Sequence, residues 1–281
     1  MINIEQAQQA WENAFNSGTR EERIARNAKV SLYFNYLAAR QDADKLPSKD
    51  DSYALALVRD CGLHTDSTVL DVGCGAGGAA LTFAKKCKSV AAIDMCSEML
   101  RVARRRAELT NANNVSFTEL LWENFTAPEK FDLCYAAMCG GICNLNELLR
   151  FESYSRKSCA VVTIGYKGKV SARNRLRETI TSNPLPGLLA EGIYLFDLLY
   201  AMGRRPNVIE TSSRSVSKLT VDEAIKRFSI YYGAYGYDDE LSQKRMLEYI
   251  KSNAQDGMWV EDDEVTTMLI YWNVPKENSG V

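Results

Sequence analysis

Residues 69–78 read VLDVGCGAGG, an apolar run that contains an acid and continues into a glycine-rich turn. Helix-forming residues follow at 79–86, and a second apolar run at 90–93 ends in Asp94. Glycines allow the backbone to turn tightly, and they allow a ligand to approach the main chain without meeting a Cβ atom. An acid at the end of the second strand of a βαβ unit can accept hydrogen bonds from ribose hydroxyls. The segment therefore predicts a site for a nucleoside-bearing cofactor.

The acid before the turn separates two classes of cofactor. Gly73, Gly75 and Gly78 also fit the dinucleotide fingerprint, which is a weak signal by itself. A carboxylate at Asp71 would repel the pyrophosphate of a dinucleotide, whereas it would attract a cationic cofactor that carries no phosphate. These residues therefore favour S-adenosylmethionine over a nicotinamide or flavin nucleotide.

Several motifs, in order from about residue 66 to residue 165, resemble those of class I S-adenosylmethionine-dependent methyltransferases. The family's first motif, an acid followed by three spaced glycines, matches residues 71–77, and its second matches Asp94 and the apolar Met95. The helix expected at 97–110 and the strand around Asp132 match the next two elements. The resemblance implies that the cofactor, released as S-adenosylhomocysteine, is bound by Asp71, Gly73, Cys74, Gly75, Gly77, Asp94, Met95, Leu121, Trp122 and Ala137.

The resemblance also implies the fold class, which is a Rossmann-like α/β fold. We expect a mostly parallel seven-stranded sheet with an antiparallel last strand, helices on both faces and a helical N-terminal cap. The chain is expected to form a single methyltransferase domain over residues 1–281. Within it, residues 1–62 would form the cap, 63–165 the cofactor-binding half and 166–275 the substrate-side half with its inserted helices. The last strand is predicted at 267–274.

Adenine recognition departs from the family pattern. Many relatives carry an acid after the third strand, where it contacts the adenine amino group, but Leu121 stands at that place here. Trp122 matches an aromatic residue that is often found next. Adenine would then be held by apolar packing and backbone amides, with Glu119 or Glu123 as candidate substitutes for the missing acid.

The acceptor side is less defined by the sequence. Tyr33 and Tyr36 are interpreted either as residues that close over the cofactor or as helix-packing residues. Glu191 and Tyr194 share one face of an expected apolar helix, where they are candidates for substrate contact as well as for the core. The basic stretch at 167–177 is interpreted as a mobile, solvated loop, with attraction of an anionic acceptor as the alternative.

No catalytic residue can be assigned. A sulfonium methyl group is already activated, so transfer requires mainly alignment and a dry site. The single histidine, His64, precedes the first strand and is expected on a surface turn. Cys139 follows the fourth strand but lacks the preceding proline of the cytosine-C5 methyltransferases, which disfavours a nucleophilic role. Either the acceptor reacts in its resting state, or an acid or tyrosine takes its proton.

Composition narrows the classes of function further. The 281 residues carry a net charge of −2, which disfavours a dedicated nucleic-acid binder. No stretch is long and apolar enough to span a bilayer. The 8 cysteines are interpreted as reduced thiols of a cytoplasmic protein, and their spacing argues against a metal site. We therefore expect a methyltransferase for a small-molecule acceptor. The alternatives are an RNA or protein methyltransferase and a catalytically inactive regulator that binds the cofactor. The oligomeric state is not predicted.

Overall fold

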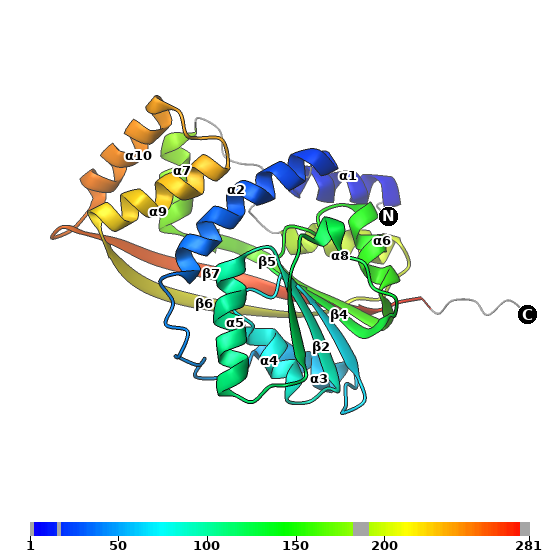
Figure 1. The fold of residues 1–281 in the computed structure, drawn as a ribbon. Coiled ribbons are helices and arrows are strands. Elements are labelled where there is room, and N and C mark those ends of the chain that lie inside the picture. Colours follow the sequence, from blue (N-terminus) through cyan, green and yellow to red (C-terminus); the bar gives the residue numbers. More distant parts are fainter. Residues whose placement is uncertain (1–2, 16–17, 182–190, 276–281) are drawn as a thin grey trace, which may run out of the picture.

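The computed structural model describes residues 3–15, 18–181 and 191–275. Its centre is a seven-stranded sheet in the order β3-β2-β1-β4-β5-β7-β6 (Figure 1). The strands are β1 (Thr68–Val72), β2 (Ser89–Asp94), β3 (Val115–Glu119), β4 (Phe131–Ala137), β5 (Ser155–Val170), β6 (Asn207–Thr220) and β7 (Met258–Asn273). The helices are α1 (Ile4–Phe15), α2 (Arg20–Ala38), α3 (Ser52–Asp60), α4 (Gly78–Ala84), α5 (Ser97–Leu109), the 3-10 helix η1 (Trp122–Asn124), α6 (Leu145–Ser153), α7 (Ala172–Ile180), α8 (Glu191–Ala201), α9 (Val221–Ala234) and α10 (Glu240–Asn253).

Strand direction follows the predicted pattern. Strands β1 to β5 pair in parallel, while β7 runs antiparallel to both β5 and β6. Parallel strands need crossover helices, and these cover both faces of the sheet. The predicted Rossmann-like sheet with an antiparallel last strand is confirmed.

Side chains along the central strands alternate between two apolar layers, one on each face of the sheet. Val69 of β1 and Leu133 of β4 belong to a buried cluster that includes residues of α3, α4 and α5. Their neighbours Leu70 and Cys134 belong to the opposite cluster, which includes residues of α1, α6 and α8. Successive strand residues point to opposite faces, so strands that are apolar throughout are expected between two helical layers.

The last strand is longer than predicted. It begins at Met258 rather than Thr267, and its additional part pairs with β6 in a two-stranded ribbon that includes the register pair Val216 and Asp262. Arg214 and Asp262 form an ion pair across this ribbon at 2.6 Å. The additional part contains the acidic run at 261–264, whose charge the cross-strand pairing partly compensates.

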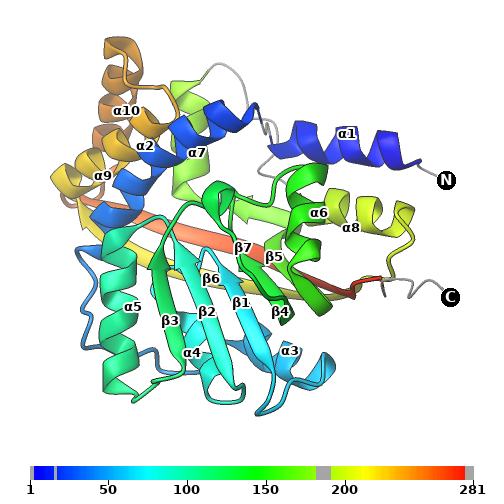
Figure 2. The same cartoon turned by 45° about the vertical axis from the view of Figure 1, so that its right-hand side comes forward.

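A third apolar cluster lies in a lobe of four helices, α2, α7, α9 and α10. Figures 1 and 2 show α7, α9 and α10 grouped at one end of the long strands β5, β6 and β7, with α2 beside α9. The cluster includes Tyr33 of α2, Leu176 of α7, Phe228 of α9 and Ile250 of α10. The interpretation of residues 167–177 as a mobile loop is wrong, because this stretch forms the end of β5 and most of α7. Its apolar residues pack into the lobe and hold it in a defined structure.

Among the described helices, none combines the length and apolar character needed to cross a bilayer.

Candidate functional site

The turn after β1 has a backbone that favours glycine. The φ angles of Gly73, Gly75 and Gly77 are 74°, 52° and 81°, in the left-handed region that other residues rarely adopt. The amides of Gly73 and Cys74 both donate to the carbonyl of Ile93 in β2, at 2.8 and 3.0 Å. The turn is therefore fastened to the carboxyl end of the neighbouring strand.

Close packing requires glycine at two of these positions, whereas the third is open. A Cβ atom at Gly73 would lie 3.0 Å from the Cβ and Sγ of Cys139, and one at Gly77 would lie 3.1 Å from the Cβ of Ala103. A Cβ atom at Gly75 would meet no atom within 4 Å. The turn therefore packs tightly on both sides and leaves open space above its middle glycine, where a ligand can approach the main chain.

Asp94 joins the turn to the beginning of α5. Its Oδ2 accepts the amide of Gly75 and its Oδ1 accepts the amide of Cys96, each at 2.8 Å. The amide of Glu98 in the first turn of α5 donates to Oδ1 of Asn35 in α2, at 3.1 Å. Helix α2 therefore lies against the carboxyl end of β2, beside the glycine turn.

Asp71 is a buried acid that has no ionic partner in the described part of the chain. It is 1% exposed, and its Oδ2 has no hydrogen-bond partner. Burial, followed by the charges of Asp51 and Asp94, raises the pKa of Asp71 to about 8, against a hydrogen bond from the amide of Ala80. A cation beside the turn would favour the ionised carboxylate and lower this pKa.

The pKa of Asp71 predicts a pH-dependent stability. The unfolded chain releases this proton near pH 4, while the folded chain keeps it up to about pH 8, so the contribution is full below about pH 4 and lost as pH rises to about 8. We expect Asp71→Asn to be more stable than the wild type at pH 8, by on the order of 1–3 kcal/mol, with a smaller difference at pH 5. Urea unfolding of both proteins at the two pH values measures the difference.

The matched control for that measurement is Asp66→Asn, because the Asp66 side chain is 87% exposed. Its stability should follow that of the wild type at both pH values. Equal stabilities of Asp71→Asn and the wild type at pH 5 and pH 8 would show that Asp71 is ionised in the folded protein.

The segment after β3 brings a buried carboxylate to the same edge of the sheet. Leu121 is half-buried, whereas Glu119 is exposed. The side chain of Glu123 is only 1% exposed, and its Oε1 accepts from Nδ2 of Asn27 in α2 at 3.4 Å. Its Oε2 has no hydrogen-bond partner among the described residues. Of the two candidate substitutes for the missing acid, Glu123 is the one with an unsatisfied buried acceptor.

A buried ionic network holds α2 and α6 to this segment. Oε2 of Glu147 accepts from Nε1 of Trp122 at 2.8 Å and from Nη1 of Arg150 at 3.1 Å, and its Oε1 accepts from Nη2 of Arg23 at 3.1 Å. The guanidinium of Arg150 lies 4.2 Å from the centroid of the Trp122 ring. Trp122 therefore has a structural place in the core, and the network positions Glu123, which follows it.

The turn after β4 completes the edge. Met138 is 58% exposed, and its backbone has a φ of 51°, in the left-handed region that residues other than glycine rarely adopt. Burial raises the pKa of the next residue, Cys139, to about 12, so its thiol is neutral at pH 7. A neutral thiol is a poor nucleophile, which agrees with the prediction against covalent catalysis by Cys139.

Comparison with known proteins assigns this arrangement. Residues 69–152 match the family model of a methyltransferase domain. Residues 69–152 therefore belong to a methyltransferase domain. An uncharacterized protein of Haemophilus influenzae is 21% identical over 252 residues, which cover 83% of this chain and 86% of that protein. A probable cobalt-precorrin-6B C(15)-methyltransferase (decarboxylating) of Methanocaldococcus jannaschii is 31% identical over 87 residues, which cover 31% of this chain and 46% of that protein.

A solved structure from Bacillus halodurans C-125, assigned as a methyltransferase, shows the same fold. It superposes with a TM-score of 0.50 at 16% identity, over 80% of this chain and all of the other. At this identity the likeness concerns the fold alone.

The other predicted cofactor contacts of the methyltransferase lie at the carboxyl edge of the sheet. Met95 follows β2 and is half-buried, and Ala137 ends β4 and is half-buried. Cys74 is buried within the glycine turn. An anchor that the sequence did not suggest is Arg106 of α5, whose Nη1 donates to the carbonyl of Ala76 in the turn at 3.2 Å. No sequence signal distinguishes Arg106 from its neighbouring arginines, because all of them lie in one basic helical run.

The predicted acceptor residues lie in different places. Tyr33 is buried in the lobe, 4.9 Å from Tyr231 between ring centroids, and the ring of Tyr36 lies 3.7 Å from Cζ of Arg40. Tyr194 is half-buried and packs on the apolar layer of α1, α6 and α8. The side chain of Glu191 lies outside the described part of the chain. The structure therefore places Tyr33 and Tyr194 in packed environments in different parts of the molecule.

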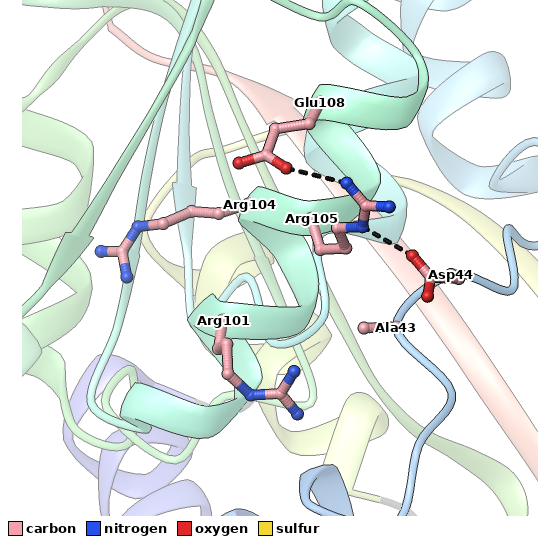
Figure 3. A pocket seen from close by; sticks show the side chains of 6 residues that line it. All are labelled: Ala43, Asp44, Arg101, Arg104, Arg105 and Glu108. Atoms are coloured by element: carbon pink, nitrogen blue, oxygen red, sulfur yellow. Dashed lines mark hydrogen bonds and ion pairs between the residues drawn. The ribbon is translucent and has the colours of Figure 1, made fainter.

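A hollow of about 440 Å³ lies on the outer side of α5, away from the glycine turn. Figure 3 shows Arg105 between Asp44 and Glu108, with Arg101 and Arg104 pointing away from it. Arg105 pairs with Asp44 and Glu108, Arg101 pairs with Glu98, and all of these side chains are exposed, as expected for a solvated helix face.

Proposed function

We propose that this methyltransferase transfers a methyl group to a small-molecule acceptor at the carboxyl edge of its sheet. The observation that supports this site is the glycine turn, which Asp94 and Ile93 fasten to β2 and which is open above Gly75. The relative from Methanocaldococcus jannaschii is named for a small-molecule substrate, although the match covers less than half of it.

The residues around the turn suit the parts of S-adenosylmethionine. Asp94 has two carboxylate oxygens at the edge of β2, where ribose hydroxyls would lie in this fold. Glu123 has an unsatisfied oxygen that can accept from the adenine amino group. Asp71, whose pKa burial raises to about 8, would lose its proton when a cation binds near the turn and would then pair with that cation.

The cofactor supplies an activated methyl group, which an acceptor lone pair displaces from the sulfonium in line. The chain contributes alignment and exclusion of water. Its only histidine, His64, has a side chain that is 59% exposed and lies near Asp66 on a surface turn, so it is not a candidate base. Proton transfer, where the acceptor requires it, is left to an acid, a tyrosine or solvent.

Binding of S-adenosylhomocysteine tests the site. Asp94→Ala removes the acceptor of two backbone amides and of the expected ribose contacts, so we expect calorimetry to show at least about a tenfold to hundredfold weaker affinity. NAD should not bind the wild type. The exposed Asp66→Ala is the control and should bind like the wild type. Unchanged affinity in Asp94→Ala would reject the proposed site.

Incubation with methyl-labelled cofactor and a metabolite extract, followed by mass spectrometry, tests the acceptor class. Label in small molecules supports the proposal, whereas label confined to RNA or protein rejects it.

The cysteines support a reducing compartment such as the cytoplasm for this activity. All eight are free thiols, and burial raises the pKa of those at 74, 87, 96 and 159.

A further inference from the structure

Two arginines of α7 form no ion pair with any residue in 3–15, 18–181 and 191–275. Arg177 is only 7% exposed, and its Nε and Nη2 are buried with no hydrogen-bond partner within the described part of the chain. Nε of Arg173, one helical turn earlier, is buried and unsatisfied in the same way. A buried guanidinium that lacks a counter-charge destabilises a fold, so its presence calls for another explanation.

The two arginines lie among tyrosines of α2 and α9. Cζ of Arg173 lies 4.6 Å from the centroid of the Tyr231 ring. That ring lies 4.9 Å from Tyr33, 5.0 Å from Tyr235 and 5.1 Å from Tyr232, between centroids. Aromatic faces attract a cation, but they carry no net charge that could neutralise it. The surroundings of the arginines are therefore polarisable and hydroxyl-bearing, with a deficit of negative charge.

The carboxylates near this cluster have other partners. Glu261 pairs with Nη1 of Arg227 at 2.7 Å, and Nε of Arg227 donates to the hydroxyl of Tyr33 at 3.4 Å. Oδ1 of Asp263 accepts the amide of Ala172 at the beginning of α7. Among the residues that the structure describes, Arg173 and Arg177 thus have no carboxylate partner.

Helix α2 connects the cluster with the edge of the sheet where the glycine turn lies. Its Tyr33 packs against Tyr231 in the cluster, and Oδ1 of its Asn35 accepts the amide of Glu98 at the beginning of α5. The helix packs against both α5 and α9. The lobe and the carboxyl edge of the sheet are therefore joined through one helix.

We propose that Arg173 and Arg177 bind an anionic group of the methyl acceptor, either a carboxylate or a phosphate. This inference rests on the proposed function and names the chemical class of its substrate. A planar guanidinium pairs with either oxyanion through two parallel hydrogen bonds, and tyrosine hydroxyls can donate further ones. Arginines buried within a helical lobe suit a small molecule, because the backbone of a nucleic acid would need an exposed groove. The proposal agrees with the alternative interpretation of the basic stretch at 167–177, in which this stretch attracts an anionic acceptor.

The experiment measures binding of three probes of similar size: phenyl phosphate, phenylacetate and the neutral phenylacetamide. We expect the wild type to bind at least one of the two anions and to bind the amide at least roughly tenfold more weakly. The preferred anion identifies the group on the acceptor. Arg173→Gln and Arg177→Gln should each lose roughly tenfold or more of that affinity. Arg175→Gln, on the exposed side of the same helix, should bind like the wild type.

Equal binding of the anions and the amide would overturn the proposal, as would an equal loss in Arg175→Gln. Arg177→Met supplies a second readout, because removal of an unpaired buried cation should raise the melting temperature while it removes the response to the anion. A lower melting temperature with an unchanged anion response would show that Arg177 is structural and overturn the proposal.

S-adenosylhomocysteine binding, measured in the same proteins, separates the two proposals. We expect the arginine variants to keep wild-type affinity for S-adenosylhomocysteine. A wild type that binds the anion but not S-adenosylhomocysteine rejects the proposed cofactor site and leaves the anion site in place. A wild type that binds S-adenosylhomocysteine but neither anion rejects the anion site alone.

Discussion

Replacement of Gly73 by valine should abolish measurable binding of S-adenosylhomocysteine. A β-branched residue at a φ of 74° is strained, and its Cβ would lie 3.0 Å from the Cβ and Sγ of Cys139. Strain of this kind, together with the displaced contact, amounts to about 3 kcal/mol or more, which corresponds to about a hundredfold loss of affinity. Calorimetry measures the affinity, and urea unfolding reports the accompanying loss of stability.

Two further glycines make this prediction specific. Gly78 is the first residue of α4 and has no positive φ, and a Cβ atom there would meet no atom within 4 Å, so Gly78→Ala should bind like the wild type. Gly75→Ala causes no clash within the protein, but its methyl group would project into the space proposed for the cofactor. We expect it to remain folded and to bind more weakly. Wild-type affinity in both Gly73→Val and Gly75→Ala would place the cofactor elsewhere.

Replacement of Glu147 by alanine should destabilise the protein by about 3–5 kcal/mol, because it leaves a buried charge without its partner. Arg23 would keep the carbonyl of Gly18 and, as an ionic partner, Glu123, whose Oε1 lies 3.9 Å from its Nε. The indole N–H of Trp122 would lose its acceptor. Equilibrium urea unfolding at pH 7 measures the change. Glu147→Gln should lose less, since the amide oxygen can still accept one of these hydrogen bonds.

The control is another glutamate that pairs with an arginine three residues away on a helix. Glu108 pairs with Arg105 on α5 at 3.2 Å, but its side chain is 66% exposed. Glu108→Ala should therefore change the free energy of unfolding by no more than about 0.5 kcal/mol. A similarly small effect of Glu147→Ala would mean that the buried network does not hold α2 to the sheet.

Local sequence patterns predicted the fold and the position of the cofactor turn. Apolar runs form β1 and β2, glycines lie between them, and Asp94 ends β2. The glycines predicted a tight turn after β1, and the structure has this turn there, with positive φ angles at Gly73, Gly75 and Gly77. The capping box of Thr220 and Glu223 at the beginning of α9 is likewise a feature of residues close together in the sequence. These features depend on residues within one or two turns of each other, which is why a single sequence shows them.

Charged segments were less predictable. The basic stretch at 167–177 was interpreted as a loop, yet it forms the end of β5 and most of α7, and the acidic run at 261–264, which lies outside the predicted last strand, forms part of β7. Asp262 pairs with Arg214, and Leu176 packs against apolar side chains of α9 and α10. In both cases the partners are far apart in the sequence. Such partners cannot be identified from local periodicity.

The amino-acid sequence alone determined the sheet, the glycine turn and the acids at its ends, because strand alternation and left-handed backbone angles are requirements of adjacent residues. Only the tertiary structure decided that Asp71 is a buried acid without an ionic partner in the described chain, that Glu147 joins α2 to the core, and that Arg177 is buried beside the tyrosines of the lobe. Burial and charge pairing depend on what the rest of the chain places around a group. For this reason the candidate cofactor site could be proposed from the sequence, whereas the candidate acceptor site could be proposed only from the packing of the helices in the lobe.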